Sequence, residues 1–308
     1  MKKKTVGLLV AVVVIVLAAI AIIFRSPPAD NSTSHGPVIT VIAGENFWGS
    51  LITQLGGNEV AVTSIVSDPN ADPHEYESNA NDAKLFATAN YVVLNGAGYD
   101  SWGDSLLSAS NNPNRKVLVV ATLLGKKEGD NPHFWYSPDY VNQVIAQMES
   151  DLISIDPKDT AYFQAQYKTL QSSLAEYQNR IGNIKHDFGS TKVASTESIF
   201  VYLADAAGLN LISPPEFIDA VAEGNDPPAS SVVEFEKQLK AQEPEVLVYN
   251  EQTVTPLTEN MKKLAAEAEI PTIGITETIQ PPDATFQEWM NAQLLQLQNA
   301  LNAKALGK

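Results

Sequence analysis

Cysteine is absent from the 308 residues of this chain. That absence excludes disulfides, thiolate zinc sites, iron–sulfur clusters, cysteine nucleophiles and lipidation of an N-terminal cysteine. Basic residues are also few, with 20 Lys and Arg against 36 Asp and Glu, for a net charge of −16. Because nucleic-acid binding needs a positive surface, this balance argues against nucleic acid as a partner and favours cations.

The chain begins with three lysines and a long apolar run. Lys2–Lys4 precede the uninterrupted run Val6–Phe24, and Arg25 ends it. About 19 apolar residues are just enough to span a bilayer, and no small-residue cleavage site follows them. We predict an uncleaved membrane anchor over 1–25, with a cleaved signal segment as the alternative. A flexible tether is expected over 26–36, with the body on the outer face of the cytoplasmic membrane.

From residue 37 onward, short β-branched runs alternate with helical patterns. Strands are predicted at 38–42, 60–66, 91–94, 116–121, 192–195, 210–212, 246–249 and 272–275. One helix is predicted to begin with Asn46 as its cap. Six more helices are predicted at 79–89, 101–109, 198–207, 230–241, 256–268 and 286–301. This alternation is typical of an α/β fold with mostly parallel sheets and covering helices. We predict an N-terminal lobe over 37–155 and a C-terminal lobe over 189–308.

A single long helix is predicted between the two lobes, over 156–188. Asp156 and Pro157 have the cap and first-turn chemistry of a helix start. Apolar residues then recur at alternating spacings of four and three, namely Phe163, Tyr167, Leu170, Leu174, Tyr177, Ile181, Ile184 and Phe188. A helix of this length spans on the order of 45 Å, which suits a rigid spine joining the lobes.

Four side chains with metal-binding chemistry follow predicted strands. Glu197 and Glu277 stand one or two residues beyond a strand, and His74 and His133 occupy loops that follow strands. Ligand groups in open α/β sheets gather beyond the carboxyl ends of strands, and clefts between lobes are common binding sites. Two imidazoles and two carboxylates suit Zn²⁺, Mn²⁺ or Fe²⁺. The ordinary alternative is a set of surface or core hydrogen bonds and helix caps.

The chemistry of the four residues favours a carrier over an enzyme. If all four bind the ion, no coordination position is left for an activated water. The sequence also has no His-Glu-x-x-His, no Gly-x-Ser-x-Gly and no phosphate-binding glycine loop. We predict a metal-binding protein without enzymatic activity. A metal-dependent hydrolase on an α/β scaffold and a surface adhesin are the alternatives.

The chain from Val38 to Leu301 resembles the metal-binding solute-binding proteins of ABC transporters, which receive zinc, manganese or iron outside the cell. The resemblance rests on six motifs in order, at residues 45–49 (ENFWG), 72–77 (DPHEYE), 94–100 (LNGAGYD), 131–135 (NPHFW), 223–228 (EGNDPP) and 248–252 (VYNEQ).

The resemblance implies a set of ligands, a cargo and a partner. His74 and His133 match the two first-lobe histidines of the family, and Glu197 matches the third ligand in its glutamate form. Glu277 replaces the more common aspartate, which adds one methylene of reach. Residues 124–130 lack the histidine-rich stretch of many zinc importers. The implied function is capture of Zn²⁺ or Mn²⁺, with Fe²⁺ as a third candidate, by a monomer that delivers the ion to a membrane permease.

Overall fold

The computed structural model of the chain describes residues 38–69 and 73–306. The predicted membrane anchor at 1–25 and tether at 26–36 lie outside the described residues. Across the ranges that are described, no helix combines the length and apolar character needed to cross a bilayer.

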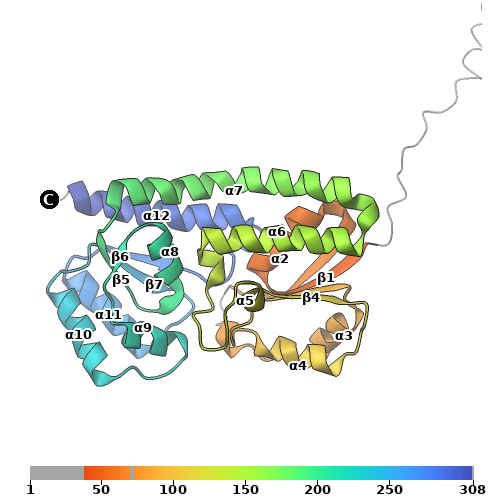
Figure 1. Cartoon of the computed structure of the whole chain (residues 1–308). Coiled ribbons are helices and arrows are strands. Elements are labelled where there is room, and N and C mark those ends of the chain that lie inside the picture. The colour runs from red at the N-terminus through yellow and green to blue at the C-terminus, as the bar shows by residue number, and fades with distance from the viewer. Residues whose placement is uncertain (1–37, 70–72, 307–308) are drawn as a thin grey trace, which may run out of the picture. The chain divides into compact units, whose positions relative to one another are not determined.

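The described residues form two four-stranded sheets in which every pair of neighbouring strands is parallel (Figure 1). The first sheet has the order β2-β1-β3-β4, with β1 (Ile39–Glu45), β2 (Val60–Val66), β3 (Tyr91–Leu94) and β4 (Lys116–Val119). The second has the order β6-β5-β7-β8, with β5 (Lys192–Ser195), β6 (Asn210–Leu211), β7 (Leu247–Asn250) and β8 (Thr272–Ile275). These sheets confirm the predicted two-lobed α/β fold.

Helices surround each sheet. The first lobe contains α2 (Asn46–Gly56), α3 (Ala80–Thr88), α4 (Ser101–Ala109), α5 (Val120–Leu123) and α6 (Pro138–Ile155). The second lobe contains α8 (Val201–Ala206), α9 (Pro215–Ala222), α10 (Ala229–Lys240) and α11 (Pro256–Glu267). We did not predict α6 or α9, although each begins at a proline in the first turn, and the Ser137 hydroxyl caps α6 by accepting from Tyr140 N–H.

Several predicted element ends are wrong by a few residues. The strand predicted over 38–42 extends to Glu45, and the helix predicted to end at 301 extends to Leu306. Asn46 is the first residue of α2 and not its cap, because its side-chain oxygen instead accepts the backbone N–H of Ile279 at 3.0 Å. The strand predicted over 116–121 ends at Val119, and α5 begins at the next residue. Residues Pro157–Asp159 form a 3₁₀ turn, so the long helix begins at Thr160.

The long helix α7 (Thr160–Phe188) extends along both lobes with α12 (Phe286–Leu306) beside it (Figure 1). Of its predicted apolar stripe, Phe163, Leu170, Leu174, Tyr177, Ile181 and Ile184 are buried, and the other two residues are partly buried against the same core. Arg180 donates to Asn291 and Gln298 of α12 at 3.0 and 3.1 Å. The two helices therefore connect the lobes through apolar and polar contacts.

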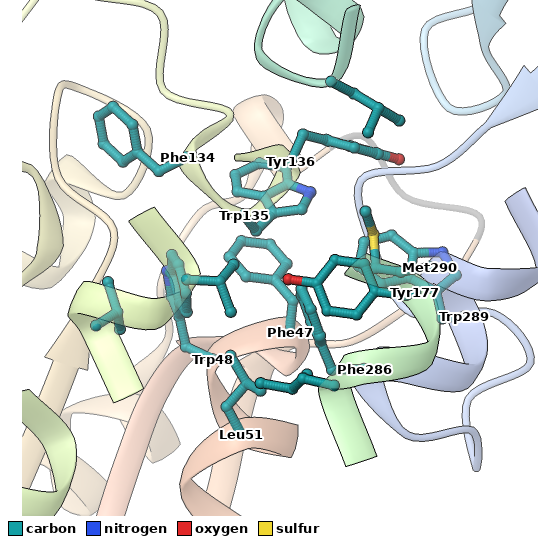
Figure 2. Packing of buried hydrophobic residues seen from close by; sticks show 14 of the residues in the cluster. Phe47, Trp48, Leu51, Phe134, Trp135, Tyr136, Tyr177, Phe286, Trp289 and Met290 are labelled. Atoms are coloured by element: carbon teal, nitrogen blue, oxygen red, sulfur yellow. The ribbon is translucent and has the colours of Figure 1, made fainter. Parts of the chain in front are cut away.

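Both lobes share one aromatic core (Figure 2). Phe47 of α2 stacks on Trp135, with ring centroids 3.9 Å apart. On the other side, Phe286 and Trp289 of α12 pack edge to face at 5.9 Å, and Tyr177 of α7 contacts Phe286. Because apolar burial is the main stabilising contribution to folding, this shared core holds the facing edges of the two lobes together.

A tight loop after β3 carries Tyr99 toward the second lobe. Gly96, Ala97 and Gly98 all have positive φ, at 76°, 58° and 92°. A Cβ on Gly96 would lie 2.7 Å from a methyl of Val119, so only glycine fits there. Asp100 closes the loop by accepting the backbone N–H groups of Asn95 and Gly96 at 2.6 and 2.8 Å.

Replacing Asp100 with alanine should lower the free energy of unfolding by about 1–3 kcal/mol, because two buried N–H groups lose their acceptor. Denaturant unfolding of the full chain measures this change. Asp283→Ala, at an exposed carboxylate, is the matched control and should stay within about 0.5 kcal/mol of the parent. Equal losses in the two variants would contradict the role given to Asp100.

Candidate metal centre

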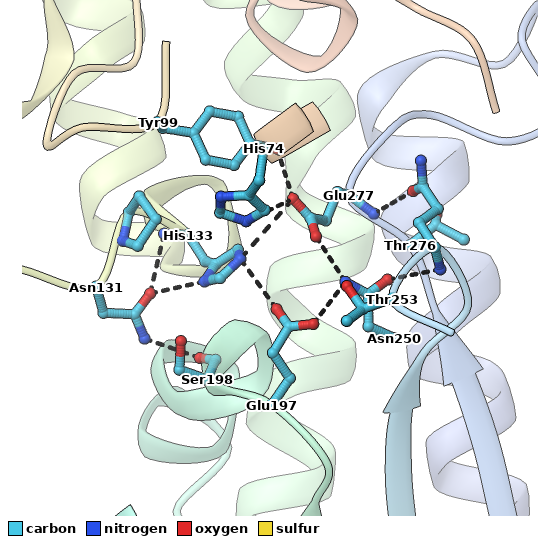
Figure 3. A network of polar contacts seen from close by, with 12 residues as sticks. His74, Tyr99, Asn131, His133, Glu197, Ser198, Asn250, Thr253, Thr276 and Glu277 are labelled. Atoms are coloured by element: carbon cyan, nitrogen blue, oxygen red, sulfur yellow. Dashed lines mark hydrogen bonds and ion pairs between the residues drawn. The ribbon is translucent and has the colours of Figure 1, made fainter. Parts of the chain in front are cut away.

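The structure brings together the four side chains that we predicted to be metal ligands (Figure 3). His74 lies in a 3₁₀ turn after β2, and His133 directly precedes the 3₁₀ turn Phe134–Tyr136. Glu197 and Glu277 each stand two residues beyond the end of a strand, β5 and β8. One nitrogen or oxygen atom from each of the four lies within 4.8 Å of the others. The convergence expected at the strand ends is therefore observed, while metal binding stays a prediction.

The four groups face a common point. Nε2 of His74 lies 3.3 Å from Oε2 of Glu277, and Nε2 of His133 lies 3.3 Å from Oε1 of Glu197. Nε2 of His133 is also 3.9 Å from Oε2 of Glu277. Three of the four side chains are fully buried, and His74 is 24% exposed. A centre of this size and composition fits one cation.

Two of these atoms have a property that favours a cation. Among the described residues, Nε2 of His133 and Oε1 of Glu197 make no well-formed hydrogen bond, and their closest approach is to each other, at a long 3.3 Å. Buried polar atoms nearly always have a closer partner, so this pair needs an explanation. A neutral imidazole nitrogen and a carboxylate oxygen can both donate a lone pair to a metal ion, and this would satisfy them together.

Asn131 determines which nitrogen of His133 is available to an ion. Its amide N–H donates to the carbonyl of Ser198 at 2.8 Å, so its carbonyl oxygen faces the imidazole. That oxygen lies 2.8 Å from Nδ1 of His133, which therefore carries the proton. The lone pair of Nε2 is then directed at the two glutamates. A hydrogen bond of this kind on the far nitrogen is typical of histidine ligands in metal sites.

The two glutamates are also held by hydrogen bonds. The Tyr99 hydroxyl donates to Oε2 of Glu277 at 2.6 Å, and the amide of Asn250 donates to both carboxylates. The sequence alone predicts no role for Asn131, Asn250 or Tyr99, although each belongs to a motif named above. The available signal was position, because Asn131 stands two residues before His133, and Asn250 ends a strand.

The charge states follow from burial and from neighbouring groups. Burial lowers the pKa of His133 to about 3, so its imidazole is neutral at pH 7. Burial, followed by the nearby Glu277 carboxylate, raises the pKa of Glu197 to about 8. Burial alone would raise the pKa of Glu277, but the charge and the hydrogen bond of His74, more than any other group, lower it well below its usual range. Without an ion, the centre therefore contains one ionised glutamate and one that is largely protonated.

A cleft of about 1180 Å³ leads to the centre between the lobes. Of the four proposed ligands, His74 lines it, and the other three do not. Its described lining has no Lys or Arg but five carboxylates, those of Glu128, Asp130, Asp219, Glu223 and Asp226. An acidic cleft raises the local concentration of cations. A cation would therefore reach the buried groups past His74.

Comparisons with known proteins agree with this chemistry. Residues 41–300 match the family described as zinc-uptake complex component A, periplasmic. The manganese ABC transporter substrate-binding lipoprotein PsaA of Streptococcus anginosus is 24% identical over 213 residues, covering 64% of this chain and 68% of PsaA. The iron-binding protein YfeA of Yersinia pestis is 24% identical over 202 residues, covering 62% of this chain and 63% of YfeA.

The fold also matches solved structures. The solute-binding protein FpvC of Pseudomonas aeruginosa, in complex with Mn²⁺, has a TM-score of 0.71 at 18% identity, covering 87% of this chain and 99% of FpvC. That likeness shows a common fold. Because the family match extends over most of the chain, the protein belongs to the zinc-uptake component A family, whose members are metal-binding solute-binding proteins of ABC transporters.

Proposed function

We propose that this chain captures one divalent transition metal ion with His74, His133, Glu197 and Glu277 and delivers it to an ABC-transporter permease. The convergence of these four groups, three of them fully buried, carries the proposal. Family membership supports transport as the role, because the family consists of solute-binding transport components.

The donor set limits the cargo to a class of ions. Two neutral imidazoles and two carboxylates balance the charge of one divalent ion, and suit Zn²⁺, Mn²⁺ or Fe²⁺ more than Ca²⁺ or Mg²⁺, which prefer oxygen ligands. PsaA is named as a manganese protein, YfeA as an iron-binding one, and FpvC was solved with Mn²⁺. We propose Zn²⁺ or Mn²⁺ as the cargo, with Fe²⁺ as a third candidate.

The same donor set favours a carrier over a metal-dependent hydrolase. Catalytic zinc sites keep three protein ligands and an open position for water, whereas four protein ligands complete a tetrahedral site. Here four side chains already converge within 4.8 Å. We therefore propose that the ion is bound and released without chemical change.

Uptake of metal by cells tests this proposal. Deleting the gene from its host should lower the zinc or manganese content of cells grown with limiting metal. The parent chain and Asp283→Ala should restore it, and Glu277→Ala should not. Full restoration by Glu277→Ala would contradict delivery through this centre.

Metal binding at pH 7 should release protons, because burial and the Glu277 carboxylate raise the pKa of Glu197, which must lose its proton to bind. The proton competes with the ion, so affinity should rise with pH up to about 8 and level off above it. Calorimetry in buffers with different ionisation enthalpies measures the release. Less release is expected at pH 9 than at pH 7, and less in Glu197→Gln than in the parent chain at pH 7. Equal release at both pH values by the parent chain would contradict this assignment.

A further inference from the structure

The order of strands in the second sheet places Asn250 between the two glutamates. Glu197 follows β5 and Glu277 follows β8, and β7 lies between these strands. Asn250 is the last residue of β7 and is 2% exposed. A side chain at this point can reach both carboxylates at once.

The amide of Asn250 makes this double contact (Figure 3). Its Nδ2 lies 2.7 Å from Oε2 of Glu197, 2.6 Å from Oε1 of Glu277 and 2.9 Å from Oγ1 of Thr253. Its Oδ1 accepts the backbone N–H of Gln252 at 2.9 Å. Because an amide has one donor end and one acceptor end, this last bond requires the amino group to face the carboxylates.

Each glutamate therefore has one carboxylate oxygen that accepts from Asn250 and one that faces the histidines. The second oxygens are Oε1 of Glu197 and Oε2 of Glu277. Oε2 of Glu277 also accepts from Tyr99, but it still lies 3.3 Å from Nε2 of His74 and 3.9 Å from Nε2 of His133. The two oxygens bound by Asn250 are instead turned toward its amide, so their orientation, and not the hydrogen bond alone, keeps them from an ion between the four groups.

We propose that Asn250 is a positioning residue that restricts each glutamate to one metal-binding oxygen and so sets the coordination number at four. This inference rests on the proposed metal-binding function and extends it to selectivity. Zinc prefers four tetrahedral ligands, whereas manganese prefers six ligands that are rich in oxygen. By withholding two carboxylate oxygens, Asn250 favours Zn²⁺ over Mn²⁺.

Cobalt(II) is a suitable probe of the coordination number, because a bound Co²⁺ ion absorbs visible light strongly in a four-coordinate site and weakly in a six-coordinate one. The experiment compares the purified full-length chain with Asn250→Ala and Asn250→Ser, and with Asn260→Ala as the control. Asn260 donates to Glu236 through the same type of amide, but it lies on α11, away from the centre. Titrations with Zn²⁺ and Mn²⁺ give the selectivity of each protein.

The parent chain and Asn260→Ala should bind one Co²⁺ with the strong spectrum of a four-coordinate site. Asn250→Ala and Asn250→Ser should bind one Co²⁺ with a spectrum several-fold weaker. Their Zn²⁺ affinity should fall by about 10–100-fold, as for other residues that orient metal ligands, with a smaller loss for Mn²⁺. An unchanged spectrum or loss of cobalt binding in both variants would overturn the inference alone. Failure of the parent chain to bind Zn²⁺ or Mn²⁺ at all would overturn the proposed function and this inference with it.

Discussion

Glu277→Ala is expected to weaken Zn²⁺ binding by more than about 100-fold, because it removes a proposed ligand. Substitution of a residue that only orients a ligand already lowers metal affinity by about 10–100-fold. The substitution removes the carboxylate that approaches both histidines, at 3.3 Å from His74 and 3.9 Å from His133. It also leaves the hydroxyl of Tyr99 and the amide of Asn250 without one acceptor each. Titration against a competing chelator measures the change in affinity.

The matched control for this change is Glu234→Ala, which removes an exposed carboxylate on α10. It should leave the affinity within about twofold of the parent chain, since solvent and salt screen exposed charges. His74→Ala separates two forms of the centre. A large loss of Zn²⁺ affinity in His74→Ala together with a small loss in Glu277→Ala would mean a three-ligand site. That result would support the metal-dependent hydrolase over the carrier.

Phe47→Ala is expected to lower the free energy of unfolding by about 3–5 kcal/mol, the usual cost of deleting a buried phenylalanine ring. The Phe47 side chain is fully buried, stacks on Trp135 and packs edge to face on Trp48. Trp135 in turn contacts the imidazole of His133 at 5.2 Å between ring centroids. The cavity should therefore weaken metal binding as well as folding.

Denaturant unfolding of the metal-free chain measures the effect of Phe47→Ala. Phe47→Leu, which fills most of the same volume, should lose less, and Val233→Ala, at a side chain that is 66% exposed, should change stability by less than about 0.5 kcal/mol. A loss for Phe47→Ala no larger than that of Val233→Ala would contradict the central place given to the aromatic core.

Sequence periodicity predicted the fold well where one face of an element is buried. The 4-3 apolar spacing from Phe163 to Phe188 matches the buried stripe of α7, because the stripe packs on a single continuous core. Most strands were predictable because they are short, rich in β-branched residues and bounded by turn residues. The helices α6 and α9 were missed, although their proline starts were visible in the sequence.

The approach of Glu197 and Glu277 to each other was predictable because a parallel sheet places the residues after its strands at one edge. Glu197 and Glu277 follow β5 and β8 by the same two residues, so their approach follows from topology. The residues that orient them were not predictable in the same way. Asn131 contacts His133 at 2.8 Å, and Asn250 contacts Glu197 and Glu277 at 2.7 and 2.6 Å. These contacts depend on side-chain rotamers and on strand order. Neither property is readable from one sequence.

Anomalous diffraction from crystals of the full chain grown with Zn²⁺ tests the central claim most directly. The account predicts one peak per chain at about 2.0–2.2 Å from Nε2 of His74, Nε2 of His133 and one oxygen each of Glu197 and Glu277. A peak elsewhere, or one bound by three of these groups with a water in the fourth position, would contradict a closed four-ligand carrier.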